Sequence, residues 1–191
     1  MDKIRLTTKQ ELNIYMNPIR QQLLRQLNIN KDPMTPKMLA DKLNISASGV
    51  QHHIKKLMSL GLIERDHTEM INGITASFYK PIQVTVQIGL EQEDDTTQQR
   101  KVFMQNSLAK VYEGFCEQMA KRVEREGKAE VDNLQQWGDI LSGVVYLKEK
   151  ESKELIKLIM TYIEQHASLS PDCIPWEFAM ILYNAEELGD D

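Results

Sequence analysis

Residues 46–60 constrain the fold of this chain more than any other segment, because their spacing defines a helix with two unlike faces. At about 100° per residue, Val50, Ile54 and Leu57 fall on one narrow apolar stripe. One face of this helix can pack against a core while the other stays free for recognition. The free face is small, polar and basic: Ser48, His52, Lys55 and Ser59 lie roughly opposite the stripe, and Gln51 and Lys56 lie on its flanks.

Both ends of the predicted helix carry residues that favour helix termini. Ser46 is a good N-cap, because its hydroxyl can accept a hydrogen bond from a free backbone N–H. Gly61 lies where a residue in the left-handed conformation would end the helix. We therefore expect a short, well-delimited helix.

Two further helices are predicted upstream by a capping residue followed by proline. Thr35-Pro36 opens a helix through Leu43, and Asn44-Ile45 forms the turn into the next helix. Asn17-Pro18 opens a helix through Leu27, whose apolar face is formed by Ile19, Leu23, Leu24 and Leu27. Two short helices joined by a few residues, the second exposing small and amide side chains, make a helix-turn-helix.

A β-hairpin is predicted to follow. Residues 62–67 and 74–81 have strand character, and they flank Asn72-Gly73, a dipeptide that favours positive φ and tight hairpin turns. A helix-turn-helix followed by a hairpin makes a winged helix. We place this unit in residues 1–81.

These residues resemble the ArsR-type winged-helix transcription regulators over roughly residues 15–81. The matching positions are Asn17-Pro18-Ile19-Arg20 with Leu23-Leu24, Leu39-Ala40 to Leu43, Ser46, Val50, His52-His53-Ile54, Leu57 and Gly61-Leu62-Ile63. The resemblance implies that the second helix enters the DNA major groove and that the hairpin lies along the flanking backbone. It also implies a homodimer on an inverted repeat.

The chain departs from this family pattern in three places. Residues 38–43 lack the paired cysteines of the metal-sensing members, which argues against a thiolate metal sensor. Gly49 lies inside a helix, where Gly costs about 1 kcal/mol relative to Ala; it either permits close backbone approach to DNA or relieves crowding against a neighbouring helix. The wing segment 68–73 has no Arg or Lys, so Arg65 and Lys80 are the remaining wing cations.

The charge distribution favours nucleic-acid binding by the first part of the chain. The whole protein has a net charge of −5, but residues 1–81 hold 12 Lys and Arg against 7 Asp and Glu, whereas residues 82–191 hold 11 against 21. Phosphate contacts from cations provide most sequence-independent affinity for DNA. We expect Ser48, Gln51, His52 and Lys55 to read bases, Lys56 and Arg65 to hold phosphates, and Ser46 to lie at the same interface.

An alternative use of the same fold is a protein-interaction module, in which the basic helix face contacts an acidic partner. DNA binding that depends on salt favours the regulator, and no binding at low salt favours the interaction module.

Residues 82–191 are predicted to form a dimerisation and effector region that is α+β or helical, which makes the whole chain α+β. Residues 82–90 alternate as in a half-buried strand. Strands are also expected over 139–147 and 175–183, the latter with a helix over 176–188 as the alternative. Helices are expected over 98–126 and 148–166, and the first has an apolar stripe typical of a core or a subunit interface: Met104, Leu108, Val111, Phe115, Met119 and Val123.

No catalytic constellation, phosphate-binding loop or metal-ligand spacing is present, so we expect neither an enzyme nor a cofactor. Cys116 is expected in the core and distant from Cys173, and His53 is expected to be packed with its ring nitrogen bonded. Any effector is expected to be apolar and organic, or a protein, in a pocket lined by residues 103–119, Tyr146, Trp176 and Phe178. The chain lacks a membrane span or signal region, which predicts a cytoplasmic protein.

Overall fold

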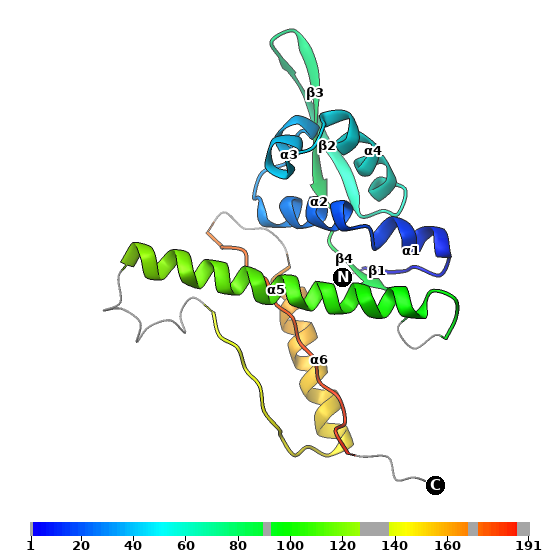
Figure 1. The fold of residues 1–191 in the computed structure, drawn as a ribbon, viewed down its shortest axis with the longest axis vertical. Helices are drawn as coiled ribbons and strands as arrows, with labels where there is room; N and C mark the ends of the chain where they lie inside the picture. Colours follow the sequence, from blue (N-terminus) through cyan, green and yellow to red (C-terminus); the bar gives the residue numbers. More distant parts are fainter. Residues whose placement is uncertain (1, 90–92, 127–137, 168–171, 187–191) are drawn as a thin grey trace. The chain divides into compact units, whose positions relative to one another are not determined.

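The structure is a computed structural model that describes residues 2–89, 93–126, 138–167 and 172–186 (Figure 1). It confirms an α+β fold with a helix-turn-helix, a β-hairpin wing and helices in the C-terminal half. The elements in chain order are β1 (Asp2–Arg5), α1 (Lys9–Tyr15), α2 (Pro18–Ile29), α3 (Pro36–Leu43), α4 (Ala47–Met58), β2 (Ile63–Ile71), β3 (Ile74–Pro81), β4 (Val84–Gln87), α5 (Thr97–Glu126) and α6 (Glu149–Gln165).

The starts of the first four helices follow their capping residues. Asn17 and Thr35 accept backbone N–H groups of the first turns of α2 and α3, with proline at the next position in each case. Thr8 and Glu11 form a capping box at α1, in which each side chain accepts the other residue's backbone N–H. Ser46 Oγ accepts the Gly49 N–H at 3.1 Å and starts α4.

The turns use residues that tolerate positive φ. Asn44 ends α3 at φ 53° and directs the chain into α4, and Gly61 has φ 71° between α4 and β2. The wing turns at Asn72 and Gly73, with φ 49° and 78°, which places Ile71 opposite Ile74 in the antiparallel pair. The predicted hairpin is therefore confirmed, with β2 longer than expected.

The core of the winged helix lies where α2, α3 and α4 meet the base of the wing. Its buried side chains come from each of these elements, so tertiary packing stabilises every one of these helices in addition to its intrinsic helix propensity. The apolar stripe predicted for α4 is fully buried. The core residues are Leu23, Leu27, Met34, Leu39, Ala40, Val50, Ile54, Leu57, Leu62 and Ile63.

A second, parallel sheet extends this core. β1 pairs with β4 in register from Asp2 opposite Val84 to Arg5 opposite Gln87. Ile4, Val84 and Val86 pack against the core from this sheet. The strand predicted over residues 82–90 is thus confirmed at its centre, whereas the partner strand β1 was not predicted.

In the C-terminal half the two helices are confirmed as α5 and α6, but the predicted strands are wrong. Residues 139–147 and the described residues 172–186 form neither strand nor helix. A strand needs a partner for its backbone groups and cover for its apolar face. These segments have neither within the described chain, and Leu141 and Tyr146 are 91% and 94% exposed.

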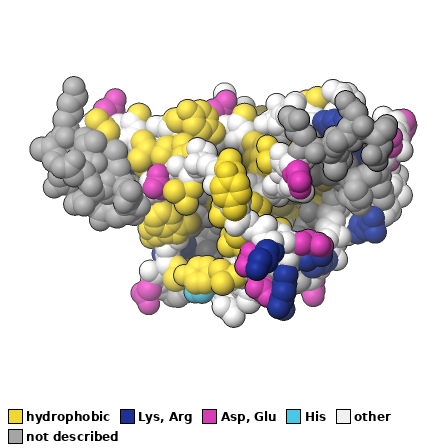
Figure 2. All heavy atoms as spheres, turned by 90° about the horizontal axis from the view of Figure 1, so that it is seen from below, with side chains coloured by type: hydrophobic (Ala, Val, Ile, Leu, Met, Phe, Trp, Pro, Cys, Tyr) yellow, Lys and Arg dark blue, Asp and Glu magenta, His cyan; other side chains and the backbone are white. Residues whose placement is uncertain are grey.

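Contacts divide the chain into residues 1–101 with 145–175 and residues 102–144 with 176–191. Among the described residues, every buried side chain belongs to residues 6–100. Cys116 is exposed, contrary to its predicted place in the core, because α5 has no buried face in the single chain. Hydrophobic side chains are accordingly open to solvent on the face of the molecule seen in Figure 2.

Gly49 and Ser46 generate a first prediction, because an added Cβ at Gly49 would lie 3.0 Å from Ser46 Oγ. Gly49→Ala should stabilise the protein by less than the roughly 1 kcal/mol expected from helix propensity. Ser46→Ala should cost about 1 kcal/mol, and in that background Gly49→Ala should recover its full gain. Urea unfolding followed by circular dichroism measures all four free energies. Equal gains in both backgrounds would show that crowding of the cap is not the reason for Gly49.

Candidate nucleic-acid interface

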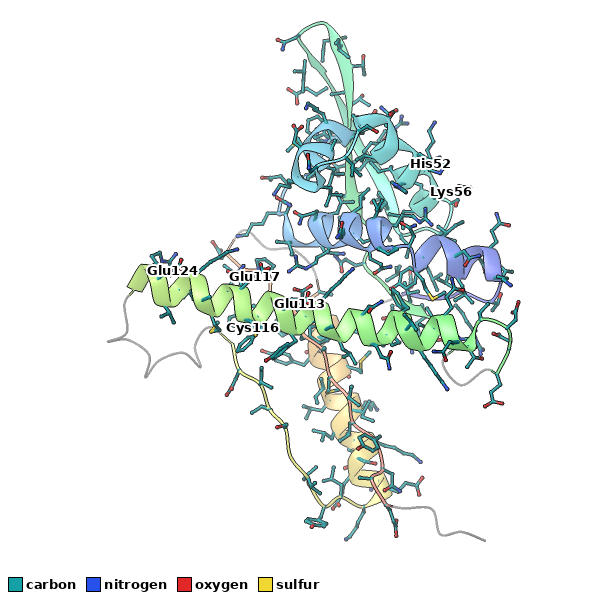
Figure 3. The ribbon with its side chains drawn as sticks, in the orientation of Figure 1. His52, Lys56, Glu113, Cys116, Glu117 and Glu124 are labelled. Carbon is teal, nitrogen blue, oxygen red and sulfur yellow. The ribbon has the colours of Figure 1, made fainter. Side chains whose placement is uncertain are left out.

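The two faces of α4 are those predicted from its sequence. Val50, Ile54 and Leu57 are at most 1% exposed, which fixes the rotation of the helix about its axis. The opposite face is open to solvent. Its exposed residues are Ser48, Gln51, His52 and Lys55, and Lys56 is half-buried beside them. Figure 3 shows His52 and Lys56 projecting from the side of α4 that faces away from α3.

The first turn of α4 is a cluster of hydroxyl groups. Ser46 and Ser48 are both exposed, and their Oγ atoms lie 3.2 Å apart. Ser46 Oγ is also the acceptor of the Gly49 N–H, so its lone pairs serve the cap before any ligand. Ser48 keeps more of its hydrogen-bonding capacity for a partner.

Arg20 connects α4 to the two helices behind it. It lies on α2 and donates to the backbone carbonyls of Asn13, at 2.8 Å, and Ile14 in the last turn of α1. Its Nη1 lies 3.3 Å from Nδ1 of His53 on α4. The guanidinium therefore satisfies carbonyls at a helix end and holds α4 from behind.

His53 is half-buried with a ring nitrogen bonded, as predicted. Burial lowers the pKa of His53 from its ordinary value, and the charges of Arg20 and His52 lower this pKa further. The neutral imidazole is the form that can accept from Arg20. Sequence reasoning missed Arg20, because the pairing depends on where α1 ends in space and no local pattern encodes it.

The cations divide into two kinds. No ion pair with another described residue involves Lys55, Lys56 or Arg65. Lys80 instead lies 2.9 Å from Asp66 and 3.4 Å from Glu64 on β2, so these carboxylates neutralise it. The hydrogen bond from Lys80 to Asp66 lowers the pKa of that carboxyl group. Of the two wing cations, Arg65 is the one without a carboxylate partner in the described structure.

The pairing of β2 with β3 shifts register at Asp66, between Arg65 and His67. His67 stacks on Phe78 across the hairpin, with ring centroids 4.4 Å apart. Beyond this point the exposed wing residues include three large apolar side chains, Met70, Ile71 and Ile74. The structure thus places no basic group near the wing tip, as the sequence indicated.

Three of the residues expected to line an effector pocket lie at the surface. Tyr146, Trp176 and Phe178 are all more than half exposed. Within the described ranges there is also no group of three or more His, Cys, Asp or Glu side chains placed to hold a metal ion. Nor does any helix in those ranges have the length and apolar character needed to cross a membrane.

Comparison with known proteins supports the helix-turn-helix. The family model described as a helix-turn-helix domain matches residues 15–66, which are α2, α3, α4 and the start of the wing. No curated protein matches the chain.

Solved structures with similar folds include three bacterial or archaeal proteins. NolR from Sinorhizobium fredii is 20% identical, with 54% of this chain and 81% of that chain covered and a TM-score of 0.31. A possible transcriptional regulator from Methanosarcina mazei is 16% identical, with 64% of this chain and 81% of that chain covered and a TM-score of 0.29. The multiple antibiotic-resistance repressor MarR from Listeria monocytogenes is 16% identical, with 83% of this chain and 80% of that chain covered and a TM-score of 0.33. The chain contains a helix-turn-helix domain over residues 15–66.

The lowered pKa of His53 generates a second prediction. Because the folded state favours neutral His53, the unfolded state binds more protons near and below pH 6.5, and the stability attributed to neutral His53 is lost as the pH falls from about 7.5 to 5.5. His53→Gln should reduce this pH dependence, while His52→Gln, at the exposed neighbour, should reduce it less. Urea unfolding midpoints across this range provide the measurement. An unchanged pH dependence in His53→Gln would contradict the role of the Arg20 contact.

Proposed function

We propose that this protein is a sequence-specific, DNA-binding transcription regulator. The observation that carries the proposal is the exposed face of α4, which presents hydroxyl, carboxamide, imidazole and ammonium groups on a helix held by a buried stripe. The major groove of B-DNA is about 12 Å wide, and a helix with its side chains is about 10–12 Å across. α4 therefore has both the dimensions and the chemistry to enter it.

Within this proposal the exposed side chains of α4 have distinct roles. Ser48, Gln51, His52 and Lys55 face the base edges. Carboxamides pair well with adenine and lysines with guanine O6 and N7, so Gln51 and Lys55 are the main sources of discrimination. The phosphate-binding residues are Lys56 and Arg65, whose charges no described carboxylate neutralises, and Ser46 lies at the start of the same helix.

We further propose that the protein acts as a homodimer on an inverted repeat, with residues 1–81 binding DNA and residues 82–191 forming the dimer interface. The supporting observation is that no described residue after Arg100 is buried. The apolar stripe of α5 is only half-buried, from Met104 to Val123. A second copy of the chain would cover this stripe, and its two-fold axis would match the symmetry of the operator.

Any effector in this proposal is apolar and organic, or a protein. Soft transition metals select thiolates or clustered imidazoles. The two cysteines lie 57 positions apart in sequence, at residues 116 and 173, and His52 and His53 diverge by about 100° around α4. The described residues therefore offer no soft-metal sensor of the kind found in metal-responsive regulators.

Selection of bound sequences from a random duplex pool tests the proposed function. We expect enrichment of an inverted repeat, which would report specificity, dimer symmetry and half-site together. No enrichment, combined with no binding of random duplex at low salt, would contradict the proposal. That result would instead favour the winged helix as a protein-interaction module.

Substitutions in α4 generate a third prediction. Gln51→Ala should cost about 1–3 kcal/mol on the selected site and much less on random DNA, because a base contact adds discrimination. Lys56→Ala should weaken binding to both and lower the salt slope by about one unit, because it removes a phosphate contact. Fluorescence anisotropy at several salt concentrations measures both effects. Gln98→Ala and Lys101→Ala, at exposed positions of α5, are matched controls.

If Gln51→Ala lost the same binding free energy on the selected and the random duplex, Gln51 would be a contact to the DNA backbone and not to a base. A salt slope for Lys56→Ala equal to that of Lys101→Ala would remove Lys56 from the phosphate contacts.

The half-buried stripe of α5 generates a fourth prediction. Val111 lies at the centre of the stripe, and Val111→Asp would place a charge in an apolar interface. Light scattering should give twice the chain mass of 22.1 kDa for the unchanged protein and the single chain mass for this variant. Val102→Asp, on another side of α5, should stay dimeric. A dimeric Val111→Asp variant with unchanged helix content would place the interface elsewhere.

A further inference from the structure

The winged helix contains an open hollow beside the recognition helix. It has a volume of about 450 Å³ and is lined by side chains of three helices, the consecutive α1 and α2 and the more distant α4. Three of these side chains are cationic, two are carboxamides, one is aliphatic and none is acidic. The lining residues are Lys9, Gln10, Asn13 and Ile14 from α1, Arg20 from α2 and Lys56 from α4.

The three cations differ in how firmly they are held. Arg20 is fixed by the carbonyls of α1 and by His53, so it contributes a stationary positive charge to the wall. Lys56 has no ion pair with a described residue. Lys9 contacts Asp95 at 2.5 Å, but both side chains are more than 60% exposed, and such surface pairs are weak and easily exchanged.

We propose that this hollow binds a phosphodiester group of the DNA backbone, with Lys9 and Lys56 as its cationic ligands and Asp95 as the internal competitor for Lys9. The inference rests on the proposed function, which it extends from α4 to α1. It adds a contact from outside the residues that match the helix-turn-helix domain, because Lys9 precedes residue 15.

The position of Lys56 explains why a phosphate would lie there. A helix nearly fills the major groove, so the two phosphate backbones run along its flanks and not along its tip. Lys56 is half-buried on the flank of α4, one residue beyond the exposed Lys55. Because Lys9 shares a hollow with Lys56, a phosphate bound by Lys56 would lie within reach of Lys9.

The competing carboxylate belongs to a turn with well-defined hydrogen bonds. Asp94, its neighbour, accepts hydrogen bonds from the Thr96 side chain and backbone and from Arg100, which lower the Asp94 pKa to about 2. A second contact joins the start of α5 to the wall of the hollow, where Gln99 donates to Asn13 Oδ1 at 3.1 Å. Phosphate binding would thus exchange one anion for another on Lys9 and release Asp95, in the turn before α5, from its contact with α1.

A double-mutant cycle in the full-length protein tests this inference with random-sequence duplex. Lys9→Gln should lower the salt slope by about 0.9, the value for one lost phosphate contact. Asp95→Asn should raise affinity roughly 1.5- to 5-fold, the factor that corresponds to removing a surface ion pair. In the Lys9→Gln background, Asp95→Asn should have no effect, because its partner is absent.

Matched variants separate a local contact from general electrostatics. Lys3→Gln on β1 and Asp2→Asn remove the same charges outside the hollow, and both should leave the salt slope nearly unchanged. A slope for Lys9→Gln equal to that for Lys3→Gln would overturn the site. Additive effects of Lys9→Gln and Asp95→Asn would overturn the competition.

The failure of this inference is distinguishable from the failure of the proposed function. If the unchanged protein binds no duplex at low salt, both fail. If it binds and only the Lys9 and Asp95 variants behave as their controls, the inference alone fails. Inorganic phosphate, titrated without DNA and followed by NMR of the Gln10 and Asn13 amides, should cause no saturable shift in the low millimolar range. A saturable shift there would assign the hollow to a small phosphorylated ligand and overturn the DNA contact.

Discussion

The burial of three side chains on α4 determines the properties of the rest of the winged helix. Val50, Ile54 and Leu57 can reach the core in only one rotation of the helix, and this rotation decides which residues face outward. Full burial of each such side chain contributes about 1.5–3 kcal/mol, far more than any contact on the exposed face. The recognition face is therefore a consequence of packing, and Arg20 adds a second constraint by tying the same helix to the end of α1.

Sequence reasoning was most successful where the determining interactions are local. The caps at Asn17, Thr35 and Ser46 and the turn at Asn72-Gly73 act within a few residues, and the structure confirms each of them. The same holds for the α4 stripe, whose period belongs to a single helix. Long-range pairings could not be predicted in this way. The parallel pairing of β1 with β4 joins residues about 82 positions apart, and neither strand signals its partner.

The C-terminal half shows the opposite case, in which a clear local pattern predicted the wrong structure. Alternation of apolar residues over 139–147 indicates a strand only if a second strand and a covering layer are available. The described chain provides neither, and the residues stay exposed. The helices α5 and α6 form as predicted, because their hydrogen bonds are internal. Their apolar faces remain at best half-buried, and the proposed dimer would cover the stripe of α5.

The charge that the candidate interface presents depends on which of its cations form ion pairs, and not on the net charge of the chain. At physiological salt the Debye length is about 8 Å, so a phosphate interacts mainly with the charges immediately beside it. The net charge of −5 for the chain is therefore a poor guide to DNA binding. Two carboxylates at the base of the wing neutralise the charge of Lys80, whereas no described carboxylate pairs with Lys55 or Lys56. Asp95, just before α5, contacts a cation of the hollow, so in the proposed DNA complex this exposed carboxylate would adjust affinity while more distant acidic residues are screened.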